Sequence, residues 1–432
     1  MKLLFIENRY KTWFYEAIVK KLKVEHEIFW IVQNKEFTPN TQNVNVIPYP
    51  KEQDLELSSS VIDVSKAIES DRQVNFFKKK DTRYFAYYAL KIEEILNEIQ
   101  PDIVFGESTA FHELIAIEVC KAQDILYLNP SSCRYPTGRF SFYKYDTLTP
   151  FKGSGESLNK KVAVDIINII ANRDSKPDYM KIRKTSKSVI LKDKLKIIKS
   201  YLLGEQYNTP APKIKYRKEK QRKLNIQEWD KLAQIDVNEE KFTVLYPLQM
   251  QPEANIDVWG RKCRNQLDAI KQLHNCLEET DLLYVKPNPK SKYELSSDLI
   301  GYITNHSNII MLKHNVSMDN IFNKTDLFIT VTGTIAIECI LSNKPVITLI
   351  ETLNNTAKNC LFVKDVSDLN KLIELARNNN FPTITQEDQI TFLSLLNKTS
   401  YPGIISDPFV APNCMTEENI DNMVDAFKKV LK

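Results

Sequence analysis

The sequence predicts an α/β protein with two Rossmann-like domains that face each other across a cleft. Three observations support this fold class: the chain has 432 residues, 43% of them hydrophobic; short apolar runs alternate with helical patterns; and this alternation stops and then restarts near residue 240. At roughly 150 residues per domain, the length suggests two or three domains. The apolar runs are continuous rather than alternating, which is typical of parallel strands covered on both faces.

Two series of elements follow from this pattern. The first series has expected strands at residues 3–6, 28–32, 44–47, 103–105 and 125–128, with helices at 82–99 and 111–121. The second series has expected strands at residues 243–246, 282–286, 309–312, 327–330 and 346–349, with helices at 263–277, 318–322 and 334–341. Strands separated by helices call for right-handed crossovers and doubly wound sheets. Ligands of such sheets bind at the carboxyl ends of the strands.

The same patterns divide the chain into four expected segments. Residues 1–205 form an N-terminal domain with a helical extension, and residues 239–415 form a C-terminal domain. Between them, residues 206–238 are polar and interrupted by prolines, so we expect a basic linker that packs poorly. Residues 416–432 form a last helix after a proline-rich crossing, and we expect this helix to rest against the first domain.

The near-neutral net charge of +4 conceals a basic segment. Residues 181–223 contain 15 basic and 3 acidic residues, whereas the rest of the chain contains 44 basic and 52 acidic residues. This segment suits contact with an anionic membrane surface, because apolar residues interleave with its lysines. A solvated helix with a Lys-rich linker is the alternative. We expect no nucleic acid partner, because the segment has only three aromatic residues and the remaining chain is acidic.

Several absences narrow the chemistry. The 9 glycines form neither G-x-G-x-x-G nor the phosphate loop G-x-x-x-x-G-K-[ST], which disfavours dinucleotide oxidoreductases and P-loop proteins. The 7 cysteines include no C-x-x-C pair, and the histidines lack metal-ligand spacing, with His314 kept as a weak candidate. No Asp-x-Asp pair occurs, so we expect no metal. An early charge at Glu7 and the lack of a long apolar stretch disfavour a signal peptide and a membrane span. The scattered cysteines favour a reducing cytoplasm.

The strongest local signal follows the expected strand at 327–330. Thr332, Gly333 and Thr334 lie in the turn before a helix, where free backbone N–H groups and two hydroxyl groups can bind a phosphate. Glu338 lies one helical turn further on, where its carboxylate can accept hydrogen bonds from ribose hydroxyl groups. The structural alternative is that Thr334 caps the helix and Glu338 complements its dipole.

Two further strand ends carry polar residues. Gln249, Gln251 and Glu253 alternate along a loop that two prolines stiffen, so we expect this loop to orient a ligand. Lys286 and Asn288 end the strand at 282–286, where the lysine can meet a phosphate and the amide can meet a neighbouring oxygen or base. A plain surface turn and a solvated lysine are the structural alternatives.

In the first domain, three residues follow the expected strand at 103–105. Glu107 ends the strand, and His112 and Glu113 begin the next helix. We expect a carboxylate or imidazole of this group to take a proton from an acceptor hydroxyl group. Structurally, Glu107 can simply lie near a helix start and His112 can simply pack.

Several of these motifs occur together in residues 240–350. They are Tyr246-Pro-Leu-Gln-Met-Gln-Pro-Glu, Asn265-Gln-Leu-Asp-Ala-Ile, Leu283-Tyr-Val-Lys-Pro-Asn-Pro, and Thr332-Gly-Thr-Ile-Ala-Ile-Glu-Cys-Ile with Lys344-Pro-Val-Ile. In these residues the second domain resembles the bacterial capsule and surface polysaccharide biosynthesis family, which includes transferases of Kdo and related ulosonic acids. Arg134-Tyr-Pro-Thr-Gly-Arg-Phe is similar to a first-domain segment of this family. The family has a His-Pro pair where this chain has Asn288-Pro289.

The resemblance implies a metal-independent glycosyltransferase of the two-domain GT-B type. Its second domain would bind a nucleotide-sugar donor, most simply a CMP-activated ulosonic acid of the Kdo, sialic or pseudaminic type. Its first domain would bind a surface glycan or lipid-linked glycan acceptor, with the enzyme peripheral on the inner face of the cytoplasmic membrane. Because Asn288 cannot carry the charge of a histidine, two alternatives stay open: a UDP-, GDP- or dTDP-sugar transferase, and a nucleotide-sugar epimerase of the same fold.

Overall fold

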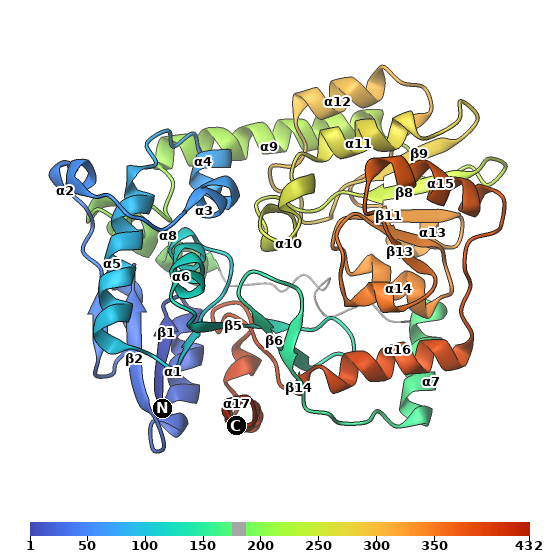
Figure 1. Cartoon of the computed structure of the whole chain (residues 1–432). Helices are drawn as coiled ribbons and strands as arrows, with labels where there is room; N and C mark the ends of the chain where they lie inside the picture. Colours follow the sequence, from blue (N-terminus) through green and yellow to red (C-terminus); the bar gives the residue numbers. More distant parts are fainter. Residues whose placement is uncertain (175–186) are drawn as a thin grey trace. The chain divides into compact units, whose positions relative to one another are not determined.

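The computed structural model describes residues 1–174 and 187–432, so residues 181–186 of the predicted basic segment lie outside the described residues. The chain forms two compact units (Figure 1). The first unit comprises Met1–Ser157, the described part of Pro177–Lys215, and Leu395–Lys432; the second comprises 158–174 and Tyr216–Ser394. Each unit contains its own sheet with helices beside it, which confirms the prediction of two Rossmann-like α/β domains. The cleft between them stays a prediction.

The first unit is built on an eight-stranded sheet with the order β14-β6-β5-β4-β1-β2-β3, in which β7 pairs with β6. The strands are β1 Lys2–Ile6, β2 Glu27–Val32, β3 Val44–Val46, β4 Ile103–Phe105, β5 Leu126–Ser132, β6 Arg139–Lys144, β7 Pro150–Lys152 and β14 Tyr401–Pro402. β3, β2, β1, β4 and β5 run parallel, and β6 runs antiparallel to β5. The direction of winding switches between β1 and β4, where ligands of doubly wound sheets bind.

Helices pack around this sheet, and the C-terminal helix completes its core. They are α1 Lys11–Leu22, α2 Glu52–Leu57, α3 Ser65–Ser70, α4 Arg72–Phe76, α5 Arg83–Ile99, α6 Phe111–Ala122, α8 Lys187–Leu202 and α17 Glu417–Leu431. Phe427 of α17 is fully buried, and its ring centroid lies 4.9 Å from those of both Phe105 and Phe142. The chain's last residues therefore stabilise the sheet built from its first residues.

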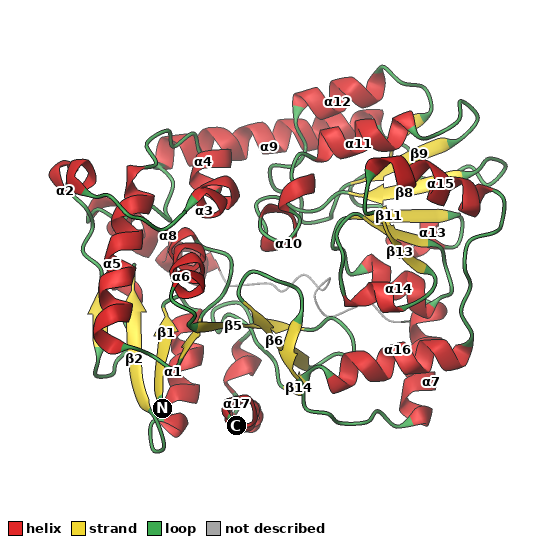
Figure 2. Ribbon diagram, viewed as in Figure 1, coloured by secondary structure: helices red, strands yellow, loops and turns green. Residues whose placement is uncertain are grey.

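The second unit has a six-stranded parallel sheet with the order β10-β9-β8-β11-β12-β13. The strands are β8 Thr243–Pro247, β9 Leu282–Lys286, β10 Ile309–Met311, β11 Leu327–Thr330, β12 Val346–Thr348 and β13 Cys360–Phe362. Figure 2 shows helices beside these strands and loops at the ends of the strands. The winding switches between β8 and β11, so the loops after these two strands flank the expected ligand position.

Some of the helices assigned wholly or largely to the second unit precede the first strand of its sheet in the sequence, and the others follow that strand. They are α7 Lys160–Ala171, α9 Pro212–Leu232, α10 Ala254–Asp257, α11 Gln266–Asn275, α12 Ser297–Thr304, α13 Met318–Phe322, α14 Ile335–Leu341, α15 Val366–Arg377 and α16 Gln386–Lys398. α9 and α16 each contain a boundary between the units. The expected domain limits at 205 and 415 are therefore corrected: α7 belongs to the second unit and residues 395–415 to the first.

The expected linker at 206–238 is wrong. Tyr207, Asn208 and Thr209 are buried in the first unit, and α9 occupies most of the remaining segment. Pro212 fits the first turn of α9, where a missing backbone N–H costs nothing. Trp229 anchors the helix, because its ring is fully buried and its Nε1–H donates to the Leu312 carbonyl at 2.8 Å. The prediction failed because the exposed residues of this long helix are polar, so its composition resembles that of a flexible linker.

Candidate functional site

The loops after β8 and β11 lie against each other at the switch point of the second sheet. Gln249 Nε2 donates to Thr330 Oγ1 at 3.2 Å, and Thr332 Oγ1 donates to the Asn255 carbonyl at 2.8 Å. A Cβ on Gly333 would lie 2.5 Å from Thr330 Oγ1 and 2.9 Å from Gln249 Nε2, so this close approach requires glycine. Gln249 and the turn at 332–334, which the sequence singled out separately, are thus brought together.

Gln251 points inward and holds the loop after β8. Its Nε2 donates to Asp257 Oδ1 at 2.9 Å, and its Oε1 accepts from Gln266 Nε2 at 2.9 Å. Gln266 also binds the backbone of Gln249, accepting from its N–H at 2.7 Å and donating to its carbonyl at 2.8 Å. Burial raises the pKa of Asp257 to about 6, against the hydrogen bond from Gln251. Gln251 therefore positions the loop, while the half-buried Glu253 uses its backbone N–H to bind Asp257 at 2.9 Å.

The turn at 332–334 differs in one detail from the expected anion site. Gly333 N–H donates to Thr330 Oγ1 at 3.2 Å, so one of the backbone N–H groups predicted to be free is already bound. Thr334 is the N-cap residue of α14, but its side chain makes no capping hydrogen bond. Capping by Thr334 therefore does not account for this helix start, and a role of Thr332 or Thr334 toward a phosphate stays a prediction.

Lys286 ends β9 and is only 3% exposed. Its Nζ donates to the Pro287 carbonyl at 3.1 Å, and burial lowers its pKa to about 8 despite the nearby charge of Asp230. The strand end is tied to the neighbouring loop, because Leu248 N–H donates to the Lys286 carbonyl at 2.9 Å. Asn288 forms a turn in which its Oδ1 accepts from Lys290 N–H at 2.8 Å. Lys286 is thus a buried ammonium group beside the switch-point loops.

Two other candidates in this unit are held by ion pairs. Glu338 is 3% exposed and pairs with Arg173, which also pairs with Asp319 at 2.7 Å. This half-buried arginine balances the charge of Glu338, and acceptance of hydrogen bonds from ribose hydroxyl groups by Glu338 stays a prediction. His314 pairs through Nδ1 with Asp230, the same carboxylate that acts on Lys286.

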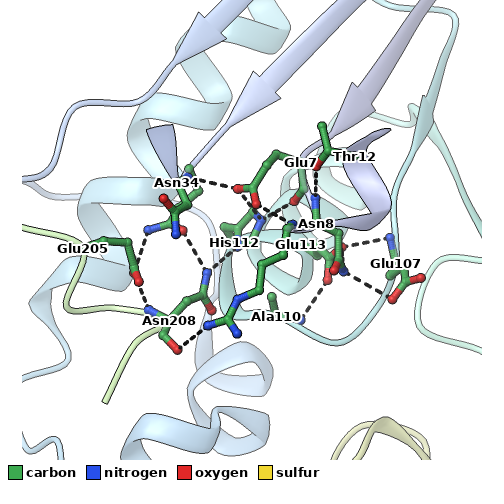
Figure 3. Close-up of polar contacts among 12 residues, drawn as sticks. Glu7, Asn8, Thr12, Asn34, Glu107, Ala110, His112, Glu113, Glu205 and Asn208 are labelled. Carbon is green, nitrogen blue, oxygen red and sulfur yellow. Dashed lines mark hydrogen bonds and ion pairs between the residues drawn. The ribbon is translucent and has the colours of Figure 1, made fainter. Parts of the chain in front are cut away.

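In the first unit, Glu107 lies at the carboxyl end of β4, beside the switch point of that sheet (Figure 3). It forms an ion pair with Lys11 and accepts a hydrogen bond from Asn8 Nδ2 at 3.2 Å. Burial raises the pKa of Glu107 and the charge of Glu113 adds to this effect, whereas Lys11 opposes it. A carboxylate with a raised pKa is suited to accept a proton near neutral pH.

Glu113 and His112 have structural partners on every polar atom. Glu113 Oε1 accepts from Asn8 Nδ2 at 2.8 Å, and its Oε2 accepts from the N–H of Ala110 at 2.8 Å, which caps α6. His112 is 2% exposed, with Nε2 2.8 Å from the Glu7 carbonyl and Nδ1 3.0 Å from Asn208 Nδ2. These two contacts fit a ring that donates from Nε2 to the Glu7 carbonyl and accepts at Nδ1 from Asn208. Of the three predicted bases, Glu107 has the environment that best suits the role.

Sequence reasoning missed three residues of the second unit as individuals. They are Gln266, Asp257 and Arg264. Arg264 accepts from Gln251 Nε2 through its carbonyl at 3.0 Å, and its buried Nη1 has no hydrogen-bond partner among the described residues. The motif that begins at Asn265 contains Gln266, but no local pattern indicates which of its side chains turns toward the loop after β8.

Within residues 1–174 and 187–432, no three His, Cys, Asp or Glu side chains are grouped so that they could hold a metal ion. No helix in those ranges is long and apolar enough to cross a membrane.

Two doubly wound sheets, each with polar loops at its switch point, define a protein of two Rossmann-like α/β domains. Residues 165–354 match the family model described as capsule polysaccharide biosynthesis protein, which confirms the resemblance inferred from the motifs. Among curated proteins, none matches the chain by sequence.

Solved structures with a similar arrangement include epimerases and a transferase. UDP-GlcNAc 2-epimerase from Methanocaldococcus jannaschii has 12% identity over 92% of this chain and 99% of its own, with a TM-score of 0.28. UDP-GlcNAc 2-epimerase from Neisseria meningitidis, bound to UDP-GlcNAc, has 11% identity over 99% of this chain and 100% of its own, with a TM-score of 0.29. KpsC from Thermosulfurimonas dismutans, a β-Kdo 2,7 transferase, has 10% identity over 92% of this chain and 100% of its own, with a TM-score of 0.36.

Proposed function

We propose that this protein is a glycosyltransferase that moves a sugar from a nucleotide donor to a hydroxyl group of a bacterial surface glycan. The donor we propose is a CMP-activated ulosonic acid of the Kdo, sialic or pseudaminic type. The match to the capsule polysaccharide biosynthesis family supports the reaction class. The observation that carries the proposal is Lys286, a buried ammonium group that, among the described residues, hydrogen-bonds a neighbouring carbonyl and forms no ion pair.

In this proposal, the second unit binds the donor at the carboxyl edge of its sheet. Lys286 neutralises the leaving phosphate, and Arg264 offers a buried donor without a protein partner among the described residues. Gln249, Thr332 and Thr334 are proposed to hydrogen-bond the nucleotide. A buried cation costs free energy, which an anionic ligand recovers when it binds. Lys286 forms no ion pair within residues 1–174 and 187–432, and this buried charge supports an anionic substrate.

The first unit is proposed to bind the acceptor and to supply the base. The acceptor hydroxyl oxygen forms a bond to the anomeric carbon, the bond from that carbon to the phosphate oxygen breaks, and the electron pair leaves with the nucleotide monophosphate. The hydroxyl proton passes to Glu107. Burial raises the pKa of Glu107, which suits a base, and the ion pair with Lys11 opposes this rise. No metal takes part in this proposal.

A second candidate function is favoured by one observation. Asn288 stands where the resembled family has a histidine, and its side-chain oxygen is used in a turn. An uncharged amide suits a donor whose phosphates are neutralised elsewhere, such as a UDP-, GDP- or dTDP-sugar, or an epimerase that keeps the donor intact. Product analysis separates these functions, because an epimerase releases no free nucleotide.

A thermal-shift panel with CMP, UDP, GDP and dTDP tests the proposed donor site. A ligand that binds only the folded protein at ~100 times its Kd stabilises it by about 2.7 kcal/mol. We expect CMP to give the largest shift in the wild type and a much smaller shift in Lys286→Met. Lys324→Met is the matched control, because Lys324 is a surface lysine of the same unit that pairs with Asp236. If no nucleotide shifts the wild type, the proposal of a nucleotide donor fails.

We also propose that α8 holds the protein on anionic membrane, at the inner face of the cytoplasmic membrane. Leu191, Leu195, Ile198 and Leu202 recur at i, i+4, i+7 and i+11, and they are 58%, 58%, 45% and 78% exposed. Lysines 192, 194 and 199 on the same helix are also exposed. An apolar stripe between lysines suits the boundary between acyl chains and anionic headgroups.

The opposite, polar face of α8 docks on the first unit. Asp193 accepts from Tyr10 Oη at 2.8 Å, and the buried Ser200 donates to Asn34 Oδ1 at 3.1 Å. Lys196 Nζ lies 4.3 Å from the ring centroid of Phe37. An ordinary surface helix packs its apolar face on the protein and exposes its polar face, whereas α8 does the reverse. This inversion is what supports a membrane partner.

Flotation of the whole protein with vesicles tests this contact. We expect recovery with phosphatidylcholine vesicles that contain phosphatidylglycerol, little recovery with pure phosphatidylcholine, and loss of recovery in Leu191→Gln/Leu195→Gln/Leu202→Gln. The control is Leu57→Gln/Val61→Gln, which removes two exposed apolar side chains elsewhere on the same unit. Equal recovery with both vesicle types, or equal recovery of the triple variant, contradicts the contact.

A further inference from the structure

Two arginines of the first unit point at one carbonyl oxygen. Arg72 Nη2 donates to the Asn208 carbonyl at 2.8 Å, and Arg9 Nη2 lies 3.5 Å from the same oxygen. Both side chains are half-buried. Each guanidinium has five N–H donors, so most of the donors in this pair are not used by that carbonyl.

The proximity of these like charges is unfavourable in the free protein. Burial and the charge of Arg9 lower the pKa of Arg72 to about 10, although Asp71 opposes this. Among the residues that the structure describes, no carboxylate oxygen forms an ion pair with either guanidinium. Arginines that are half-buried ordinarily pair with a carboxylate or another anion, because a desolvated charge is costly. Within the described part of the chain, the two guanidinium groups therefore have unused donors that an anion could accept from.

Backbone hydrogen bonds at or next to each arginine fix the positions of both residues. Arg9 has a left-handed backbone with φ of 43°, and Glu7 Oε1 accepts its N–H at 2.6 Å. A residue with a side chain keeps this conformation only when its surroundings hold it there. Arg72 begins α4 directly after Asp71, whose Oδ1 accepts from Gln73 N–H at 2.8 Å.

The carbonyl between the arginines is equally well held. Asn208 N–H donates to Glu205 Oε1 at 2.7 Å, and Asn208 Nδ2 donates to Gln33 Oε1 at 2.9 Å and lies 3.0 Å from His112 Nδ1. Figure 3 shows Asn208 linked through His112 to Glu7. Glu7 and Gln33 directly follow β1 and β2, and Glu107 follows β4 after Gly106, so the arginines lie on a rigid base at the carboxyl edge of the first sheet.

We infer that Arg9 and Arg72 form a binding site for a phosphate group in the first unit. Two planar guanidinium groups match the oxygens of a phosphate through paired hydrogen bonds, which an ammonium group cannot reproduce. Asn8, the neighbour of Arg9, donates to Glu107 Oε2 at 3.2 Å, so the site adjoins the proposed base. If the proposed function holds, the phosphate belongs to a phosphorylated glycan or lipid-linked acceptor. The other source of the same chemistry is the phosphate of the nucleotide.

Titration calorimetry with inorganic phosphate tests the site without any turnover. We use the Lys286→Met protein as background, so that the proposed donor site does not contribute. We expect phosphate binding there, and a loss of roughly tenfold to a hundredfold in affinity on adding Arg9→Gln or Arg72→Gln, as for a charge-assisted hydrogen bond. Arg72→Lys should bind phosphate more weakly than the Lys286→Met background does. Arg83→Gln is the control, because Arg83 pairs with Asp81 and Glu52 at the surface of the same unit.

Two further ligands, titrated into the wild-type protein and the two arginine variants, identify the source of the phosphate. If a sugar 1-phosphate loses affinity in the arginine variants and CMP does not, the site takes the acceptor's phosphate. If CMP loses affinity as well, the site takes the donor's phosphate. Absence of phosphate binding in the Lys286→Met background, or equal affinity of Arg9→Gln, Arg72→Gln and Arg83→Gln, overturns the inference. Arg9→Gln removes only the longer contact to Asn208, so it tests the site even if Arg72→Gln unfolds. Failure here leaves the nucleotide panel on the second unit unaffected.

Discussion

Lys286 predicts that nucleotide affinity depends on pH in a defined window. The group is 3% exposed, and burial lowers its pKa from 10.5 to about 8. An anion binds the charged form of this lysine, so the affinity is nearly full at pH 7 and falls as the pH rises through about 8. The secondary ionisation of a phosphate monoester is near pH ~6, and the pKa of Asp257 is about 6. Both lie below the window from pH 7 to pH 9.

The size of the effect follows from the pKa of Lys286. A pKa lowered from 10.5 to about 8 means that holding the charge costs about 3 kcal/mol in the free protein. If a bound phosphate restores the ordinary pKa, the nucleotide binds the charged form about 300-fold more tightly than the neutral form. Between pH 7 and pH 9 the affinity should therefore fall about tenfold. At pH 8, binding should take up about half a proton per nucleotide.

Calorimetry of CMP binding in two buffers with different ionisation enthalpies measures both quantities. We expect proton uptake at pH 8 and the fall in affinity at pH 9 in the wild type and in Lys324→Met. Lys286→Met should bind more weakly at pH 7 and show neither effect. An affinity that is constant from pH 7 to pH 9 in the wild type, or the same proton uptake in Lys286→Met, would refute the assignment of Lys286 to the phosphate.

Three further predictions concern other parts of the molecule. Glu107→Gln should lower transfer by roughly 10²- to 10⁴-fold, as for loss of a general base, with CMP affinity unchanged by calorimetry; unchanged transfer contradicts the role. Gly333→Ala should weaken CMP binding at least about tenfold, because its Cβ would lie 2.5 Å from Thr330 Oγ1; the control Gly301→Ala, with no atom within 4 Å, should not. Phe427→Ala should destabilise the first unit by about 3–5 kcal/mol in denaturant unfolding, and a loss below about 1 kcal/mol would mean that α17 does not complete the core.

The strands could be predicted because their apolar runs are continuous, and this pattern depends only on local sequence. β4, β9 and β11 begin and end at the predicted residues. β14 could not be predicted, because it has two residues and pairs with β6, which lies far away in the sequence. α9 was missed for a different reason: it buries little besides Asn225 and Trp229, so its pattern lacks an apolar face. Its lysines, glutamates and glutamines are nevertheless good helix formers.

The candidate site could be predicted as a set of strand ends, but the role of each side chain within it could not. Parallel strands put their carboxyl ends at one edge, so grouping Gln249 with the turn at 332–334 required only topology. That Gln251 turns inward depends on Asp257 and Gln266, and no periodicity reveals such partners. In the first unit, His112 is bound by Asn208, a contact between distant parts of the sequence that only the folded chain brings together.

The central claim is most directly tested by following both products of one reaction. The protein is incubated with a CMP-activated ulosonic acid and an envelope glycan extract as acceptor, and the sugar gained by the glycan is measured together with free CMP. The account predicts one CMP released per sugar transferred, a requirement for both substrates, and loss of both signals in Lys286→Met. An intact nucleotide carrying an altered sugar, or CMP release with no sugar gained by the glycan, would contradict it.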